Sequence, residues 1–329
     1  MRIALLFTAL AASSLCACAN GQATPFDDDA GASLDAATAS DAGRDAEAAS
    51  SSTTVAQACQ ENATRYCQQL EQCFPFAIRQ TWGDVATCTA TVAPACVDIL
   101  QTPGDGWTPD NLMACVRARA ALTCKTFLLR KPELAECATT GAVADGAACR
   151  WSAQCKSGYC KITTGVCGNC VTPTARGGAC ASYPDCAGDL LCAKNDTCQS
   201  PVDLNGMCDD TKPCSLGTAC IGGTCKAPGA EGAACAPMLG SIDCDYYQQL
   251  YCNGTSSKCT KYVIAKAGES CAVPNQSIVC EAGAGCANGT CTTAGTAGTL
   301  CNPSTGITCA YPLTCDMGTC HVVEASQCH

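Results

Sequence analysis

The cysteines are the residues whose number and spacing could support chemistry. The chain has 36 of them in 329 residues, and their thiols could form disulfides, hold a metal ion or act as a redox pair. Cys167-Gly-Asn-Cys170 has the C-x-x-C spacing of a redox motif and of half a zinc site. No second C-x-x-C accompanies it, and other cysteines surround it. We therefore interpret the pair as structural, and we expect no metal and no cofactor.

Other catalytic patterns are weak. The two histidines, His321 and His329, both lie at the C-terminal end, and no flanking motif places either beside a nucleophile. No glycine-rich phosphate loop follows a predicted strand. We expect no catalytic residue, and an enzyme is the least favoured of three functional classes.

The first residues are typical of an export signal. Arg2 precedes an apolar stretch, Ala4 to Leu15, that is too short to span a bilayer. Leu15-Cys16-Ala17-Cys18 follows directly and resembles a bacterial lipobox. The resemblance implies a signal peptide over residues 1–17 and a lipid anchor on Cys18. Ala19, which is not aspartate, implies sorting to the outer membrane. The alternative is cleavage before Asn20 and free secretion.

The next segment, residues 18–54, is predicted to be a tether. It is rich in alanine, serine and aspartate, and residues 19–54 carry a net charge of −6. Such a composition buries too little apolar surface to offset the entropy of ordering, so we expect a disordered spacer. The 36 residues from 19 to 54 would span about 30–36 Å. Residues 55–329 carry a net charge of −5, which argues against a nucleic-acid partner.

Residues 55–140, hereafter the helical region, differ from the rest of the chain because glycine is rare and helix formers dominate. We predict helices over 55–73, over about 84–100 with a bend at Pro94, and from Pro109 to about Leu129. A short piece should follow Pro132. The eight cysteines here should form four interhelical disulfides: Cys59, Cys67, Cys73, Cys88, Cys96, Cys115, Cys124 and Cys137.

From residue 141 to the end, the chain repeats with a period of about 30 residues. We number six repeat units by their first cysteines: Cys149, Cys180, Cys208, Cys235, Cys271 and Cys301. Five of the six have glycine three positions earlier, and unit 3 has Asn205 there, as a turn with positive φ requires. Units that contact only their neighbours should form an elongated array.

Unit 3 suggests how each unit is cross-linked. Its third and fourth cysteines enclose Ile-Gly-Gly-Thr, which is a tight β-hairpin signal. Opposed hairpin residues point to one face, so both thiols can reach back to the first two cysteines. Four cysteines allow three connectivities. Among them we predict first-to-third and second-to-fourth pairing, which in unit 3 joins Cys208 to Cys220 and Cys214 to Cys225.

Units 1 and 2 carry a family resemblance. Cys149-x5-Cys155-x4-Cys160-x6-Cys167-x2-Cys170, with Tyr159 before the third cysteine, resembles the start of the Dickkopf N-terminal cysteine-rich domain. That family has ten cysteines including an adjacent pair, whereas here Cys186 is followed by Ala187. The likeness covers about 50 residues and implies fold only. With the lipobox and tether, the whole chain is similar to cysteine-rich lipoproteins of myxobacteria and their relatives.

Cysteine parity predicts one long-range bond. Cys16 and Cys18 drop out of the pairing under either cleavage site, which leaves 34 cysteines from Cys59 to Cys328. Units 1 and 2 together hold an odd number. We therefore predict a disulfide from Cys328 to the 149–198 segment, with Cys170 as the favoured partner.

The fold class expected is thus small and disulfide-rich, an N-terminal disulfide-bonded α-helical domain followed by tandem short β-hairpin cysteine-rich repeats. We expect a cell-envelope lipoprotein, facing the periplasm or the cell surface, that acts as a non-enzymatic binding or structural module. The alternative is a secreted inhibitor or effector, for example of extracellular proteases. The partners would be the membrane, through the lipid, and a protein or glycan. Six tyrosines could contact that partner or pack internally: Tyr183, Tyr246, Tyr247, Tyr251, Tyr262 and Tyr311.

Overall fold

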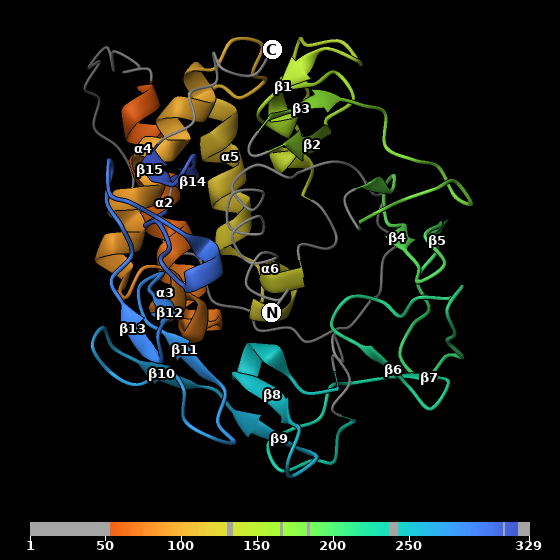
Figure 1. Ribbon diagram of the computed structural model, residues 1–329. Helices are drawn as coiled ribbons and strands as arrows, with labels where there is room; N and C mark the ends of the chain where they lie inside the picture. Colours follow the sequence, from red (N-terminus) through yellow and green to blue (C-terminus); the bar gives the residue numbers. More distant parts are fainter. Residues whose placement is uncertain are drawn as a thin grey trace, which may run out of the picture.

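The computed structural model describes residues 53–129, 134–164, 167–182, 185–236, 243–311 and 313–321. The helical region comes first and the disulfide-rich hairpin repeats come after it (Figure 1). The expected signal peptide, Cys18 and nearly all of the expected tether lie outside the described residues.

The helical region contains α2 (Val55–Cys73), α3 (Pro75–Thr81), α4 (Val85–Gln101), α5 (Pro109–Ala120), α6 (Cys124–Leu129) and the 3₁₀ turn η1 (Ala135–Cys137). Three helices begin at side-chain caps, where the hydroxyls of Thr54 and Thr108 and the carboxylate of Asp84 accept hydrogen bonds from backbone N–H groups. These caps satisfy N–H groups that no helical carbonyl reaches, so they fix where the helices start.

One helical prediction was wrong in detail, and one short helix was not predicted. The third helix does not continue to Leu129, because it ends at Ala120 and a new helix, α6, starts at Cys124. A separate short helix, α3, begins at Pro75 directly after α2. Proline is well tolerated at the first position of a helix, so Pro75 starts α3 as well as ending α2.

Helix α2 is the centre of the helical region. Cys59 bonds with Cys96 and Cys67 with Cys88, so α2 and α4 run antiparallel. Cys73 bonds with Cys124 in α6, while a fourth bond joins α5 to η1 through Cys115 and Cys137. The largest fully buried side chains of the core are Phe76, Ile78, Val92 and Ile99.

The repeats contain β1 (Ala148–Cys149), β2 (Cys160–Thr164), β3 (Cys167–Cys170), β4 (Leu191–Cys192), β5 (Cys198–Gln199), β6 (Ala219–Ile221), β7 (Thr224–Lys226), β8 (Leu250–Asn253), β9 (Lys258–Lys261), β10 (Val263–Ala265), β11 (Ile278–Cys280), β12 (Gly285–Ala287), β13 (Thr290–Thr292), β14 (Thr314–Asp316) and β15 (Thr319–His321). Short 3₁₀ turns interrupt them: η2 (Ser152–Gln154), η4 (Tyr246–Gln248) and η5 (Pro303–Thr305).

Each repeat unit is built on one antiparallel hairpin whose strands carry the third and fourth cysteines. These hairpins are β2–β3, β4–β5, β6–β7, β8–β9, β12–β13 and β14–β15. The residue six positions before the first cysteine pairs in parallel with the second cysteine, as Val202 does with Cys214. The same relation holds from Val143 with Cys155 in unit 1 to Gly295 with Cys309 in unit 6. One register therefore runs through the array.

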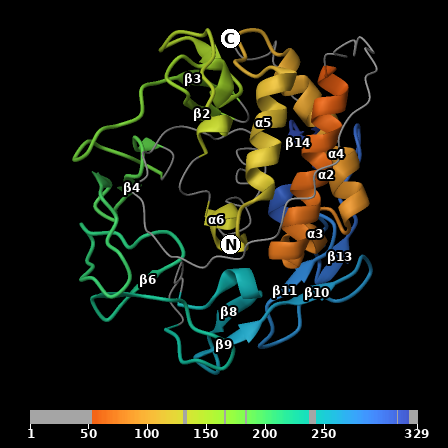
Figure 2. The same ribbon diagram turned by 180° about the vertical axis from the view of Figure 1, so that it is seen from behind.

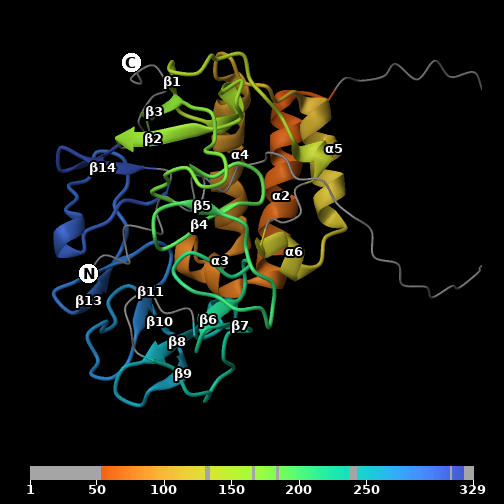
Figure 3. The ribbon, with the colours of Figure 1, turned by 90° about the vertical axis from the view of Figure 1, so that its right-hand side faces the viewer.

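The array is not elongated, so that prediction from the sequence was wrong. It leaves the helical region at β1–β3, passes through β4–β7 and β8–β9, and returns along the helices with β10–β15 (Figures 1 and 2). The last unit lies beside the helices in the side view as well (Figure 3). Units 4 to 6 also contact the helical region, units 4 and 6 through aromatic side chains and unit 5 through backbone hydrogen bonds, and this second set of contacts bends the array.

Candidate functional site

The disulfide cell is the feature that all six units share. In units 2 to 6 the first cysteine bonds with the third and the second with the fourth. Unit 1, which has five cysteines, forms the equivalent bonds Cys149–Cys160 and Cys155–Cys170. Unit 3 therefore contains the Cys208–Cys220 and Cys214–Cys225 bonds that its spacing indicated. With the four bonds of the helical region, the cysteines of both parts are committed to a structural frame.

A positive-φ turn supports each cell. The residue three positions before the first cysteine has φ between +70° at Asn205 and +89° at Gly268. Its N–H donates to the carbonyl of the fourth cysteine, at 2.7 Å for Asn205 to Cys225 and 2.8 Å for Gly268 to Cys291. Residues with a β-carbon rarely adopt this backbone conformation, and asparagine is among the best tolerated. The glycine pattern in the sequence thus marks a turn that closes the cell.

The prediction for Cys170 was wrong. Cys170 bonds with Cys155, because it lies directly opposite Cys160 across β2–β3 and so takes the place of the fourth cysteine. The additional cysteine of unit 1 is Cys167, which is itself disulfide-bonded. Cys328 lies outside the described residues.

Aromatic side chains attach units 4 and 6 to the helical region. The ring of Tyr246 lies 5.3 Å from that of Phe74 and 5.9 Å from that of Phe76, edge-on in both cases. Tyr262 stacks on Phe76 with the ring centroids 5.4 Å apart. In unit 6, Tyr311 meets Trp82 edge-on. Such pairs add to the apolar area that they bury, so this interface extends the helical core.

Five of the six tyrosines considered as partner contacts pack against other parts of the chain. Tyr246, Tyr247, Tyr262 and Tyr311 pack against the helical core, and burial raises the pKa values of Tyr246 and Tyr262. Tyr251 packs on Tyr262, and its hydroxyl accepts the N–H of Ser277. Tyr183 lies outside the described residues. Sequence alone could not separate these roles, because an aromatic residue looks the same in a contact surface and in a core.

Backbone hydrogen bonds extend this interface in unit 5. The N–H groups of Ala282 and Gly283 donate to the carbonyls of Arg79 and Gln80 at the end of α3, at 2.9 and 2.7 Å. The Arg79 guanidinium also lies 3.5 Å from the Glu281 carboxylate. This ion pair is largely exposed and contributes little, so the backbone bonds and the rings carry the attachment.

Unit 1 contacts the other end of α4. Arg150 forms an ion pair with Asp98 at 2.8 Å, and its guanidinium stacks over the Trp151 ring. The side-chain amide of Gln154 donates to the carbonyl of Pro103, and the N–H of Gly106 donates to the carbonyl of Ala153. The junction therefore combines polar contacts from two loops.

Asp105 is the ionisable group of this junction whose charged form is disfavoured by burial. One carboxylate oxygen accepts the Trp107 N–H at 2.7 Å, while Oδ2 is buried without a hydrogen-bond partner. Burial raises its pKa to about 6, and the Trp107 hydrogen bond only partly offsets that effect. Burying a carboxylate disfavours its charged form, so this group makes the junction sensitive to pH.

A buried carboxylate joins units 1 and 2. Asp185 is 3% exposed and accepts hydrogen bonds from the Tyr159 hydroxyl at 2.8 Å and from the Ala181 N–H. The Lys161 ammonium lies 3.3 Å away. Burial by itself would raise the pKa of Asp185, but these donors outweigh it and lower the pKa. The carboxylate thus serves to hold the two units together.

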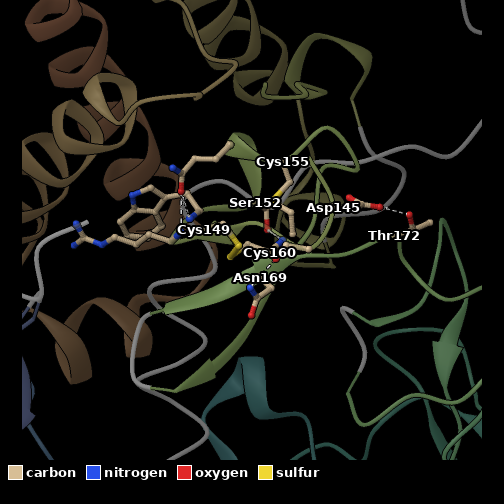
Figure 4. The surroundings of a disulfide bond; sticks show 12 residues. Asp145, Cys149, Ser152, Cys155, Cys160, Asn169 and Thr172 are labelled. Carbon is tan, nitrogen blue, oxygen red and sulfur yellow. Dashed lines mark hydrogen bonds between the residues drawn. A yellow bond between two sulfur atoms is a disulfide. The ribbon is translucent and has the colours of Figure 1, made fainter. Parts of the chain in front are cut away.

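The residues of unit 1 that could have supported chemistry have structural roles. Cys167 and Cys170 are not a redox pair, because Cys170 is bonded to Cys155. Figure 4 shows the Cys149–Cys160 bond between Ser152 and Asn169, with Asp145 and Thr172 to one side. A hollow of about 470 Å³ borders Asp145, and the Thr172 hydroxyl donates to this carboxylate and lowers its pKa. The hollow is open and its lining includes neither histidine nor cysteine.

The cysteine triplets whose sulfur atoms lie close together, for example Cys208, Cys214 and Cys220, are also parts of disulfide cells. A sulfur atom in a disulfide is not the thiolate that binds a metal ion. His321 lies 3.5 Å from Asp316 at the edge of the last hairpin, and His329 is outside the described residues.

Two exposed apolar side chains stand out in unit 6. Leu300, just before the first cysteine, is 77% exposed, and Met317, at the tip of β14–β15, is 92% exposed. Met317 also has φ +46°, which is uncommon for a residue other than glycine, asparagine or aspartate. Within the described ranges, no single helix is long and apolar enough to cross a membrane; the pair α3 and α4, bent by 73°, passes on length and composition alone.

Comparison with protein-family models, with curated proteins and with solved structures found no match to this chain.

Proposed function

We propose that the chain is an exported cell-envelope lipoprotein whose folded part is a non-enzymatic binding or structural module. The observation that carries the proposal is the disulfide frame. Sixteen disulfides among the described residues indicate an oxidising, extracytoplasmic location. Cysteines committed to such a frame are not available as nucleophiles or metal ligands.

The sequence before the folded part supports the membrane attachment. Cys18 follows an apolar stretch at the position of a lipidated cysteine, and a long acidic segment separates it from α2. The resemblance of Leu15-Cys16-Ala17-Cys18 to a lipobox points the same way. In this proposal the lipid anchors the chain to the outer membrane, the acidic segment is repelled by anionic headgroups, and the rigid repeats are presented to a protein or glycan.

The test is metabolic labelling of the full-length chain with an alkyne fatty acid in a Gram-negative host. The parent chain and Cys16→Ser, which alters a residue that leaves with the signal peptide, should label equally and fractionate with outer membranes. Cys18→Ser should lose the label and the membrane association.

A mature chain that starts at Asn20, carries no label and appears in the medium would contradict the proposal. That result would favour the alternative, a released inhibitor or effector, since such a protein acts away from the cell that makes it.

A further inference from the structure

Cys167 is the cysteine of unit 1 that its disulfide cell does not use. The cell is complete without it, through the Cys149–Cys160 and Cys155–Cys170 bonds. Cys167 opens β3 and pairs in the register with Thr164, near the tip of the β2–β3 hairpin. Its sulfur is nevertheless in a disulfide. The bond must therefore reach a cysteine outside the cell.

Elimination leaves few partners. Every other cysteine from Cys59 to Cys320 is bonded within the helical region or within its own unit. The remaining cysteines of the chain are Cys16, Cys18 and Cys328. Export removes Cys16 with the signal peptide and either lipidates or removes Cys18. Ruling out Cys16 and Cys18 as partners requires only that the chain is exported, which the disulfides themselves indicate. It holds for either cleavage site.

We propose that Cys167 forms a disulfide with Cys328 and so closes the array of repeats into a covalent ring. The circuit runs from β3 through units 2 to 6 and back to unit 1, and it includes the units that pack on the helical region. The predicted long-range bond thus keeps Cys328 as one end and takes Cys167, not Cys170, as the other.

The anchoring contacts are compatible with this closure. Unit 6 contacts Trp82, just before α4, and unit 1 contacts Asp98, near the end of α4. From the start of α4 at Val85 to Asp98 the helix rises about 20 Å at 1.5 Å per residue. Strand β15 ends at His321, and the seven residues from there to Cys328 can reach about 23–25 Å. Strands β14 and β2 lie on the same side of the helices in Figure 3.

The closing step is an ordinary thiol oxidation. The thiols of Cys167 and Cys328 each release a proton, and together they give two electrons to an oxidised dithiol–disulfide exchange catalyst of the export compartment. One S–S bond forms in the chain and one breaks in the catalyst. A single backbone cut between the two cysteines would then leave the pieces covalently joined.

The test uses that property. A recognition sequence for a site-specific protease is inserted between Ala227 and Pro228, in the connection between units 3 and 4, where no other disulfide spans the cut. The oxidised full-length chain is cleaved, its thiols are blocked, and it is run on a denaturing gel. We expect one product of full-length mass plus one water without reduction, and two fragments after reduction.

Variants at the two ends provide the controls. Cys328→Ser should give two fragments without reduction and one alkylated thiol, located at Cys167 by peptide mapping. Cys16→Ser should behave like the parent.

Two fragments from the unreduced parent would overturn the proposal, and mapping would then find Cys167 joined to Cys16 or Cys18. An uncut parent that migrates as a disulfide-linked dimer would overturn it as well, because the bond would then join two chains.

Discussion

Cys220 and Cys225 lie directly opposite each other across β6–β7, yet they do not bond to each other. Cys220 bonds with Cys208 and Cys225 with Cys214, so both bonds tie the hairpin to the segment before it. The same opposition recurs in the other five units. A bond across the hairpin would only staple two strands that already pair, whereas the observed bonds hold a unit that has little core.

Removing one of these bonds should therefore loosen one unit. The double variant Cys208→Ser/Cys220→Ser releases a loop of 12 residues in unit 3, which should cost about 2–4 kcal/mol locally. Amide hydrogen exchange should show lost protection in β6 and β7 while the helices keep theirs. The matched variant Cys235→Ser/Cys252→Ser in unit 4 should also weaken α3, because unit 4 carries Tyr246. Loss of helical signal in the unit 3 variant would contradict this local account.

The tip of the last hairpin should be under conformational strain. Met317 and Gly318 form its two-residue turn, and both have positive φ. Asparagine suits this position far better than methionine, so Met317→Asn should stabilise β14–β15 by about 1 kcal/mol. Thermal unfolding or hydrogen exchange measures the gain. Met207→Asn, at a side chain that is 76% exposed but outside the positive-φ set, is the control and should change stability by less than about 0.5 kcal/mol.

Tyr246 should be the main attachment of unit 4 to the helical region. Tyr246→Ala removes ring contacts with Phe74 and Phe76 and should cost about 2–3 kcal/mol, since the ring is only half-buried. Faster exchange at the Ala282 and Gly283 amides, which donate to α3, would report the detachment. Tyr246→Phe keeps the ring and removes the hydroxyl, which lies 3.4 Å from the Gln80 side-chain oxygen, so it should remain near parent stability. Equal losses in both variants would show that the hydroxyl, not the ring, matters.

Asp105 should make the fold more stable in mild acid. Its pKa in the folded chain, about 6, lies above the ordinary value of 3.8, so the folded state binds the proton more tightly than the unfolded state does. The stability that this group contributes is present below pH 4 and is lost as the pH rises through 6. Asp105→Asn should therefore stabilise the chain at pH 7.5 by about 1–2 kcal/mol, a value reduced for solvent screening.

The pH dependence of that gain is the critical measurement. Unfolding temperatures of Asp105→Asn and the parent should converge at pH 4, where the parent carboxyl is protonated in the folded state and about half protonated in the unfolded state. Asp210→Asn, at a side chain that is 77% exposed, is the control and should show no such convergence. A gain for Asp105→Asn that persists unchanged at pH 4 would mean that the effect is not one of charge.

Local structure followed from the sequence where a local signal existed. The helix starts predicted at 55, at about 84 and at Pro109 agree with the structure, where Thr54, Asp84 and Thr108 cap the helices, because capping involves side chains within one turn. The Gly-Gly turn of unit 3 predicted the β6–β7 hairpin because a two-residue turn is also a local signal. The return of the array onto the helices was not predictable, because it depends on rings more than 150 residues apart, such as Phe76 and Tyr262. Cys170 was misassigned because spacing alone did not show that it opposes Cys160.

The disulfide cell separates what must stay constant in each unit from what is free to change. Four cysteines and one positive-φ turn recur unchanged, whereas the stretch between the two opposed cysteines varies from four residues in units 3, 5 and 6 to nine in unit 1. A hairpin tip can thus be lengthened or rewritten without disturbing the bonds that hold its base. Each unit could therefore accept a grafted loop at its hairpin tip. Units 2 and 3 are the best positions, because their tips make no aromatic contact with the helices and a new loop there should least affect the remainder of the chain.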